Sequence, residues 1–151
     1  MIRDAIKNLI KWKNKDSRKP LIIRGARQVG KTWIMNEFGK TYYEKIAYIN
    51  FDNNQRMKSL FSGSLDIQRL LTALQIESGV KIEANNTLII FDEVQEVPPA
   101  LTSLKYFCES LPSSISSLLV TTSFWTTAFR GKLFNTFTDF DIASITEADQ
   151  Q

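Results

Sequence analysis

The apolar residues at the start of the chain have the spacing of a helix that buries one face. They fall at i, i+4, i+7 and i+8, and they are Ile2, Ile6, Leu9 and Ile10. Charged residues occupy positions between them, so the pattern predicts an amphipathic helix that packs on the domain. Residues 11–19 are rich in lysine and arginine and include Trp12. We interpret them as a solvated helix end and a loop, and a contact with nucleic acid is the alternative.

Short apolar runs alternate with segments of helical spacing along the rest of the chain. The runs that predict strands are 21–24, 46–51, 87–91, 115–122 and, as a possible short fifth strand, 133–138. Predicted helices begin near Trp33, Leu65 and Pro98, with Gly39 and Gly79 expected to end the first two. The run 87–91 suits a strand that is covered on both faces. The alternation predicts a three-layer α/β fold with a mainly parallel sheet.

The composition narrows the class of protein. A length of 151 residues fits one domain, and the net charge of +3 is too small to argue by itself for nucleic-acid binding. We divide the chain into an N-terminal helix and basic linker (1–19), a core (20–140) and a short tail (141–151). The absence of histidine excludes catalysis by histidine, Ser-His triads and histidine metal sites.

Cysteine usage and hydropathy indicate the compartment. The single cysteine, Cys108, cannot form an internal disulfide, which suggests a reducing environment. Its helical position favours a role as core filler over a reactive thiol. The N-terminus does not have the pattern of a signal peptide, and no apolar run approaches the ~20 residues that cross a bilayer. We therefore expect a cytoplasmic protein without a membrane segment.

The strand predicted at 21–24 leads directly into the sequence G-x-x-x-x-G-K-T, and a predicted helix follows. This is the pattern of a phosphate-binding loop in its strand-loop-helix setting. The glycines allow close approach of the backbone, whose N–H groups can hold phosphate oxygens at the positive end of the helix. Lys31 would reach the β/γ-phosphates, and Thr32 would bind Mg²⁺. The candidate nucleotide-binding residues are Gly25, Ala26, Arg27, Gln28, Val29, Gly30, Lys31, Thr32 and Trp33.

Two carboxylates follow the strand predicted at 87–91. Asp92 comes at its carboxyl end, the edge where ligands bind in open α/β sheets. There it can support the Mg²⁺ directly or through water. Glu93 comes next and can polarise the water that attacks the γ-phosphate. We therefore take Thr32 and Asp92 as metal-site candidates and Glu93 as the catalytic base, in a P-loop NTPase fold.

The guanine-reading motifs of GTPases do not follow the phosphate loop. The segment Asn14-Lys15-Asp16 does not have the N-K-x-D pattern and precedes the loop, and no D-x-x-G segment is present. ATP is therefore the expected nucleotide.

With these residues in view, the chain resembles the AAA-type P-loop ATPases of bacteria and archaea that usually carry a C-terminal domain of unclear function. The resemblance is carried by residues 24–32, 48–51, 89–98 and 100–109. It implies a RecA/AAA-like fold, ATP and Mg²⁺ as cofactors, and work on a macromolecular partner, with an oligomer possible.

The resemblance also implies further site residues. The family has a strand that ends in a Gly-Ser pair, which corresponds here to Thr122-Ser123, so Ser123 becomes the candidate γ-phosphate sensor beside Lys31 and Glu93. The following Gly-Arg element is approximated by Gly131-Lys132, and Arg130 is the alternative arginine finger. The family's lid and second domain would follow the core, so we expect a truncated member or fragment with weak hydrolysis.

Three functions stay open at this point. The leading hypothesis is Mg²⁺-dependent ATP hydrolysis. The second is a nucleotide-dependent binding module that has lost turnover, and the third is a P-loop kinase. Glu93 and the lack of a recognisable acceptor-binding lid count against the kinase.

Overall fold

The computed structural model describes residues 2–15, 20–25, 30–83, 86–110, 117–123 and 141–144. Side chains are described for these residues except 2–3, 104–105, 107–110 and 141–144. The helices are α1 (Ile2–Lys13), α2 (Lys31–Tyr42), α3 (Gln55–Ser62), α4 (Ile67–Ser78), the 3₁₀ helix η1 (Val94–Glu96) and α5 (Pro98–Ser110). The strands are β1 (Leu21–Arg24), β2 (Lys45–Asn50), β3 (Thr87–Asp92), β4 (Leu118–Thr122) and β5 (Asp141–Ser144).

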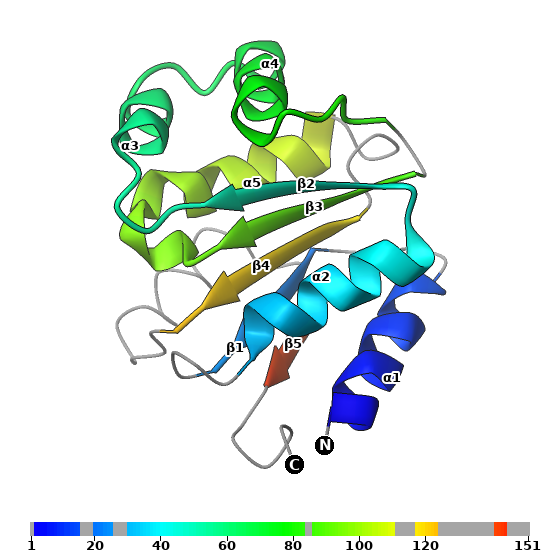
Figure 1. Ribbon diagram of the computed structural model, residues 1–151. Coiled ribbons are helices and arrows are strands. Elements are labelled where there is room, and N and C mark those ends of the chain that lie inside the picture. The colour runs from blue at the N-terminus through cyan, green and yellow to red at the C-terminus, as the bar shows by residue number, and fades with distance from the viewer. Residues whose placement is uncertain are drawn as a thin grey trace.

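The strands form one sheet in the order β2-β3-β4-β1-β5, and every neighbouring pair is parallel. This confirms the mainly parallel sheet. All carboxyl ends therefore lie along one edge, as the arrowheads in Figure 1 show. Strand β1 lies between β4 and β5, so the loop that follows β1 begins well inside this edge.

The sheet continues past residue 140, where we expected the core to end. Strand β5 runs parallel to β1, with Leu21 opposite Asp141 and Arg24 opposite Ser144. The segment Asp141–Ser144 has only two apolar residues, too few for a continuous apolar run, so its place in the sheet follows from pairing with β1 and not from a local pattern. The expected strand at 133–138 lies outside the described residues.

Alternate residues of the strands face two separate core clusters. In β3, Ile89 and Phe91 pack with apolar residues of α3, α4 and α5. Leu88 and Ile90 point to the other face and pack with apolar residues of α1 and α2. Figure 1 shows these two groups of helices on opposite sides of the sheet. The three-layer α/β architecture is therefore confirmed, and it explains why β3 is apolar at successive positions.

Helix α2 does not end at Gly39, as we expected, but continues to Tyr42. Gly39 is buried inside the helix, and a Cβ atom at this position would lie 2.6 Å from Ile46 Cδ1 and 3.1 Å from Leu88 Cδ2. The glycine thus serves the close approach of α2 to β2 and β3. Gly79 does end α4, in the left-handed conformation with φ of 72° that a C-terminal cap requires.

Helix α3 was not predicted from the sequence. It begins after Asn54, whose side chain accepts a hydrogen bond from the backbone N–H of Met57. Met57 and Phe61 bury its inner side. The helix contains only eight residues, so its apolar periodicity is short.

The described part of the basic stretch, residues 11–15, is only partly exposed. Trp12 is buried among the side chains of α1, α2 and the sheet. The aromatic ring that made a nucleic-acid contact conceivable therefore belongs to the core. Lys13 lies over the ring of Tyr43, with its Nζ atom 5.3 Å from the ring centroid. Within the part of the chain that the structure describes, no helix is long and apolar enough to span a bilayer.

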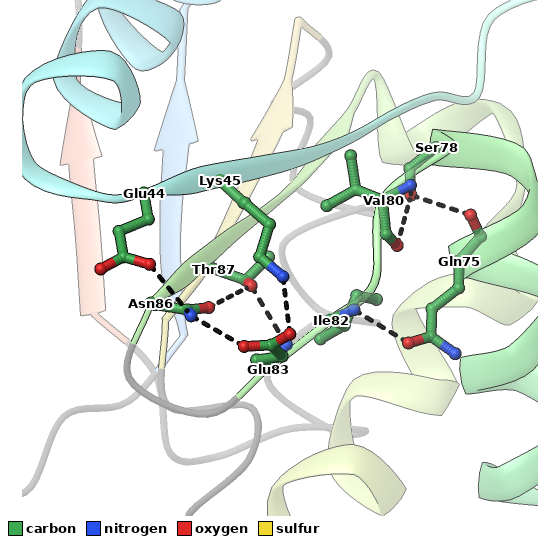
Figure 2. A network of polar contacts seen from close by, with 9 residues as sticks. All are labelled: Glu44, Lys45, Gln75, Ser78, Val80, Ile82, Glu83, Asn86 and Thr87. Atoms are coloured by element: carbon green, nitrogen blue, oxygen red, sulfur yellow. Dashed lines mark hydrogen bonds and ion pairs between the residues drawn. The ribbon is translucent and has the colours of Figure 1, made fainter.

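A polar network joins the starts of β2 and β3 to the segment that leaves α4 (Figure 2). Lys45 Nζ lies 2.9 Å from Glu83 Oε1, and Asn86 Nδ2 donates to Glu83 Oε2 at 2.9 Å. The hydrogen bond from Lys45 is the largest cause that lowers the pKa of Glu83. The hydroxyl of buried Thr87 donates to Asn86 Oδ1 and accepts from the backbone N–H of Glu83. This network lies at the sheet edge opposite the carboxyl ends of the strands.

We expect Thr87→Val to destabilise the protein by about 1–3 kcal/mol, because it leaves the Glu83 N–H and the Asn86 amide oxygen without this partner. Thr72→Val is the matched control, since its exposed hydroxyl bonds only to the carbonyl of Gln68 in the preceding turn. Urea denaturation monitored by circular dichroism measures both variants. An equal effect of the two substitutions would show that Thr87 does not stabilise the network.

Candidate functional site

The predicted site residues that the structure describes gather at the carboxyl edge of the sheet. Gly25 follows β1, Asp92 ends β3 and Ser123 follows β4, while the first turn of α2 comes next to them. The backbone N–H of Gly25 donates to the carbonyl of Thr122 at 3.2 Å, which ties the start of the loop to the end of β4. The edge is thus built from β3, β4 and β1, which are neighbours in the sheet although β1 lies far from the other two in the sequence.

The described ends of the phosphate loop have the geometry that the motif needs. Gly30 is in the left-handed conformation, with φ of 87° and ψ of 14°, which favours glycine. It precedes the first residue of α2 and makes no side-chain cap, so the positive end of the helix faces the loop. The loop residues Ala26, Arg27, Gln28 and Val29 lie outside the described residues.

Lys31 and Thr32 direct their side chains to the ends of two other strands. The buried Lys31 ammonium donates to the carbonyl of Gly25 at 2.5 Å and to Ser123 Oγ at 3.0 Å. Thr32 Oγ1 donates to Asp92 Oδ2 at 2.8 Å. Trp33 follows with its indole 54% exposed, so only its backbone N–H, in the first turn of α2, is placed to face the loop.

The carboxylate of Asp92 is buried and accepts three hydroxyl hydrogen bonds. Thr121 Oγ1 donates to Oδ1 at 2.5 Å, and Thr32 and the Tyr48 hydroxyl both donate to Oδ2. Burial raises the pKa of Tyr48 above its usual range, and the hydrogen bond to Asp92 raises it further. The phenol therefore keeps its proton and remains a donor to the carboxylate.

Glu93 is held in an uncommon backbone conformation. Its φ of 58° and ψ of 47° are left-handed, a conformation that costs a non-glycine residue about 1–3 kcal/mol and persists only where the surrounding contacts fix it. Its N–H donates to Thr121 Oγ1 at 3.0 Å, so one hydroxyl contacts both acidic residues. Its carboxylate accepts from Ser123 Oγ and from Gln95 Nε2, each at 2.6 Å. These bonds aim the Glu93 carboxylate along the same edge as Lys31.

The structure thus joins six of the predicted residues in hydrogen-bonded contacts: Lys31 to Gly25 and to Ser123, Ser123 to Glu93, and Thr32 to Asp92. The arginine-finger candidates Arg130 and Lys132 lie outside the described residues. Tyr48, Thr121 and Gln95 were not predicted as site residues. The hydroxyl of Thr121 in a buried strand was the one available signal, since a buried hydroxyl needs a partner.

Thr32 and Asp92 suit a magnesium ion. Mg²⁺ prefers oxygen ligands and is usually held by one or two carboxylates together with substrate phosphates. A hydroxyl and a carboxylate 2.8 Å apart beside the phosphate loop supply this donor set. The residues present therefore fit the metal that the motif implies.

The sequence comparison identifies the family. Residues 17–131 match the family described as AAA domain, which is more than half of the chain. The chain belongs to this family. The AAA domain described here is a P-loop NTPase fold and a nucleotide-binding domain of the ATPase type. No curated protein matches the chain.

Solved structures with a similar fold share little sequence with this AAA domain. PCH-2 of C. elegans has 12% identity and a TM-score of 0.54, over 95% of this chain and 42% of that one. The Aeropyrum pernix ORC1 protein, solved in complex with DNA, has 14% identity and a TM-score of 0.51, over 93% and 43%. Drosophila ORC bound to poly(dA/dT) DNA and Cdc6 has 9% identity and a TM-score of 0.54, over 96% and 28%. The AAA domain spans less than half the length of each of these chains.

Proposed function

We propose that this AAA domain binds ATP together with Mg²⁺ and hydrolyses the bond between the β- and γ-phosphates. The observation that carries the proposal is the joining of Lys31, Ser123 and Glu93 in one chain of hydrogen bonds, next to the Thr32–Asp92 pair. A phosphate-binding lysine, a metal-binding pair and a carboxylate base at one sheet edge are the groups that phosphoryl transfer to water requires.

Each group has a distinct role in this proposal. The Lys31 ammonium and the loop N–H groups bind the β- and γ-phosphates, and Thr32 and Asp92 hold the metal. Bound Mg²⁺ would neutralise charge on the phosphate oxygens. Glu93 accepts the proton of the attacking water, and Ser123 lies between the base and the lysine, where its hydroxyl can contact the γ-phosphate.

A phosphate-release assay on the purified protein, with and without Mg²⁺, tests the proposal. The proposal predicts steady release of phosphate that depends on Mg²⁺. ATP binding without release would instead indicate a nucleotide-dependent binding module. ADP formation only after addition of a small acceptor would indicate a kinase.

We expect Asp92→Asn to remove most of the Mg²⁺ dependence of ATP binding, since the metal loses its carboxylate support. Loss of such support costs about tenfold or more in metal affinity. Asp66→Asn is the matched control: Asp66 caps α4 through a bond to the Gln68 N–H, and asparagine caps equally well. Calorimetric titration with ATP, at zero and saturating Mg²⁺, measures both. An Asp92→Asn variant with the parent's Mg²⁺ dependence would remove Asp92 from the proposed metal site.

We propose that the domain uses ATP turnover to act on a macromolecular partner. Support comes from the family resemblance and from the similarity in fold to ORC proteins whose structures contain DNA. Assembly of several copies is part of the same proposal. The buried position of Trp12 gives no support to a DNA contact through that ring.

A further inference from the structure

Tyr48 contacts the proposed metal site from a strand that carries none of the other site residues. It lies in β2, on the face that packs against α1 and α2, and its hydroxyl donates to Asp92 Oδ2. In the strand register Tyr48 is opposite Ile90, whereas Asp92 is opposite Asn50. The phenol must therefore extend along the sheet, toward the carboxyl edge, to reach the carboxylate.

The contacts of Asp92 leave its carboxylate little freedom to rotate. Three hydroxyls fix it from three elements: Thr32 from α2, Tyr48 from β2 and Thr121 from β4. An ionised carboxylate has about four acceptor positions, so these donors use most of them. Because Oδ2 accepts from both Thr32 and Tyr48, a change in either donor alters the place of this oxygen.

The orientation of Asp92 in turn sets the orientation of the Thr32 hydroxyl. The Thr32 hydrogen points to Oδ2, so the lone pairs of Thr32 Oγ1 point away from the carboxylate. These lone pairs are what a hydroxyl offers to a metal ion. A carboxylate that turned would take the Thr32 hydroxyl with it.

The hydroxyl of Tyr48 is not needed to fill space. Phenylalanine would place the same ring against the core cluster without putting a polar group beside a buried carboxylate. The half-buried hydroxyl instead donates a hydrogen bond to the buried Asp92 carboxylate, a contact that a phenylalanine ring cannot make. Its position therefore indicates a task at Asp92.

We propose that Tyr48 is a positioning residue that orients the Asp92 carboxylate, and through it the Thr32 hydroxyl, for binding of a divalent cation. This inference rests on the proposed function, because the cation is taken to bind with ATP. Residues that orient metal ligands typically change metal affinity by about 10–100-fold when they are removed. Tyr48 thus sets the Mg²⁺ affinity of the site through Asp92 and Thr32.

The test compares Tyr48→Phe with Tyr43→Phe. Tyr43 is the matched control, since its hydroxyl also donates to a side-chain oxygen, Ser117 Oγ at 2.9 Å, away from the site. Binding of Mn²⁺ to the ATP complex, followed by electron paramagnetic resonance, gives the metal affinity. Calorimetry with ATP in EDTA gives the nucleotide affinity without metal, and thermal melts show that both variants fold.

We expect Tyr48→Phe to weaken Mn²⁺ binding by about tenfold or more, with unchanged ATP affinity in EDTA and no change in Tyr43→Phe. Parent-like Mn²⁺ affinity in Tyr48→Phe, with a metal-dependent parent, would overturn the inference and leave the proposed function intact. An equal loss in Tyr43→Phe, or an equal loss of ATP affinity in EDTA, would also overturn it. A parent that binds no ATP would overturn the proposed function itself.

Discussion

Replacement of Lys31 by alanine is expected to weaken ATP binding by about tenfold or more. A hydrogen bond to a charged group contributes roughly 1.5–3 kcal/mol, and about 1.4 kcal/mol corresponds to a tenfold change in affinity. The Lys31 ammonium lies at the carboxyl edge of the sheet between the Gly25 carbonyl and Ser123, so the substitution removes the charge at the place where phosphates would bind. Isothermal titration calorimetry with ATP measures the change.

Lys40→Ala is the matched control for this prediction. Lys40 lies on the same helix, but its side chain is 68% exposed and its ion pair with Glu37 is 3.7 Å long. Exposed pairs of this kind contribute little, so ATP affinity should stay at the parent value. Equal affinity of Lys31→Ala and the parent would contradict the assignment of the phosphate loop.

The substitution Glu93→Gln is expected to lower the rate of ATP hydrolysis by about 10²–10⁴-fold, the usual contribution of a general base. Glutamine retains one oxygen that can accept the Ser123 hydrogen bond, and its NH₂ group can donate to Gln95 Oε1 once the Gln95 amide turns over, so ATP affinity should be maintained. Only proton transfer from the attacking water is lost. Single-turnover hydrolysis on nucleotide-saturated protein separates this chemical step from binding.

Glu37→Gln serves as the control for the loss of one negative charge, because Glu37 lies on the exposed side of α2. It should hydrolyse ATP at the parent rate. A Glu93→Gln variant that hydrolyses ATP at the parent rate, or that loses ATP affinity as strongly as Lys31→Ala, would exclude Glu93 as the base.

Local sequence patterns were enough to predict the central part of the fold. They also singled out Lys31, Asp92 and Glu93, which lie at the carboxyl edge of the sheet. The apolar run at 87–91 lies in β3, with helices on both faces, and the motif from Gly25 to Thr32 runs from the end of β1 into the first turn of α2. These signals are local, since a strand with two buried faces or a glycine-rich turn before a helix is specified by adjacent residues.

The remaining features depend on contacts between distant segments. Glycine often ends a helix, and for this reason Gly39 was predicted to end α2. The close approach of Ile46 explains why glycine is present there. Trp12 belongs to a basic stretch and is buried because α1 packs against α2 and the sheet. Local patterns do not contain this information.

The same reason explains why Tyr48 and Thr121 were missed as site residues. Both contact Asp92, but Tyr48 precedes it by 44 positions and Thr121 follows it by 29. Their proximity follows from the strand order, in which β3 lies between β2 and β4. A strand order of this kind follows from the packing of the whole domain.

Titration of the purified protein with ATP and with AMP, both in saturating Mg²⁺, tests the central claim most directly. In the proposed site, most of the binding free energy comes from contacts with the β- and γ-phosphates. Lys31, the loop N–H groups and the Thr32–Asp92 pair make these contacts. The proposal therefore predicts that ATP binds at least about tenfold more tightly than AMP, which lacks both phosphates. Equal affinity for the two nucleotides, or no binding of ATP, would contradict it.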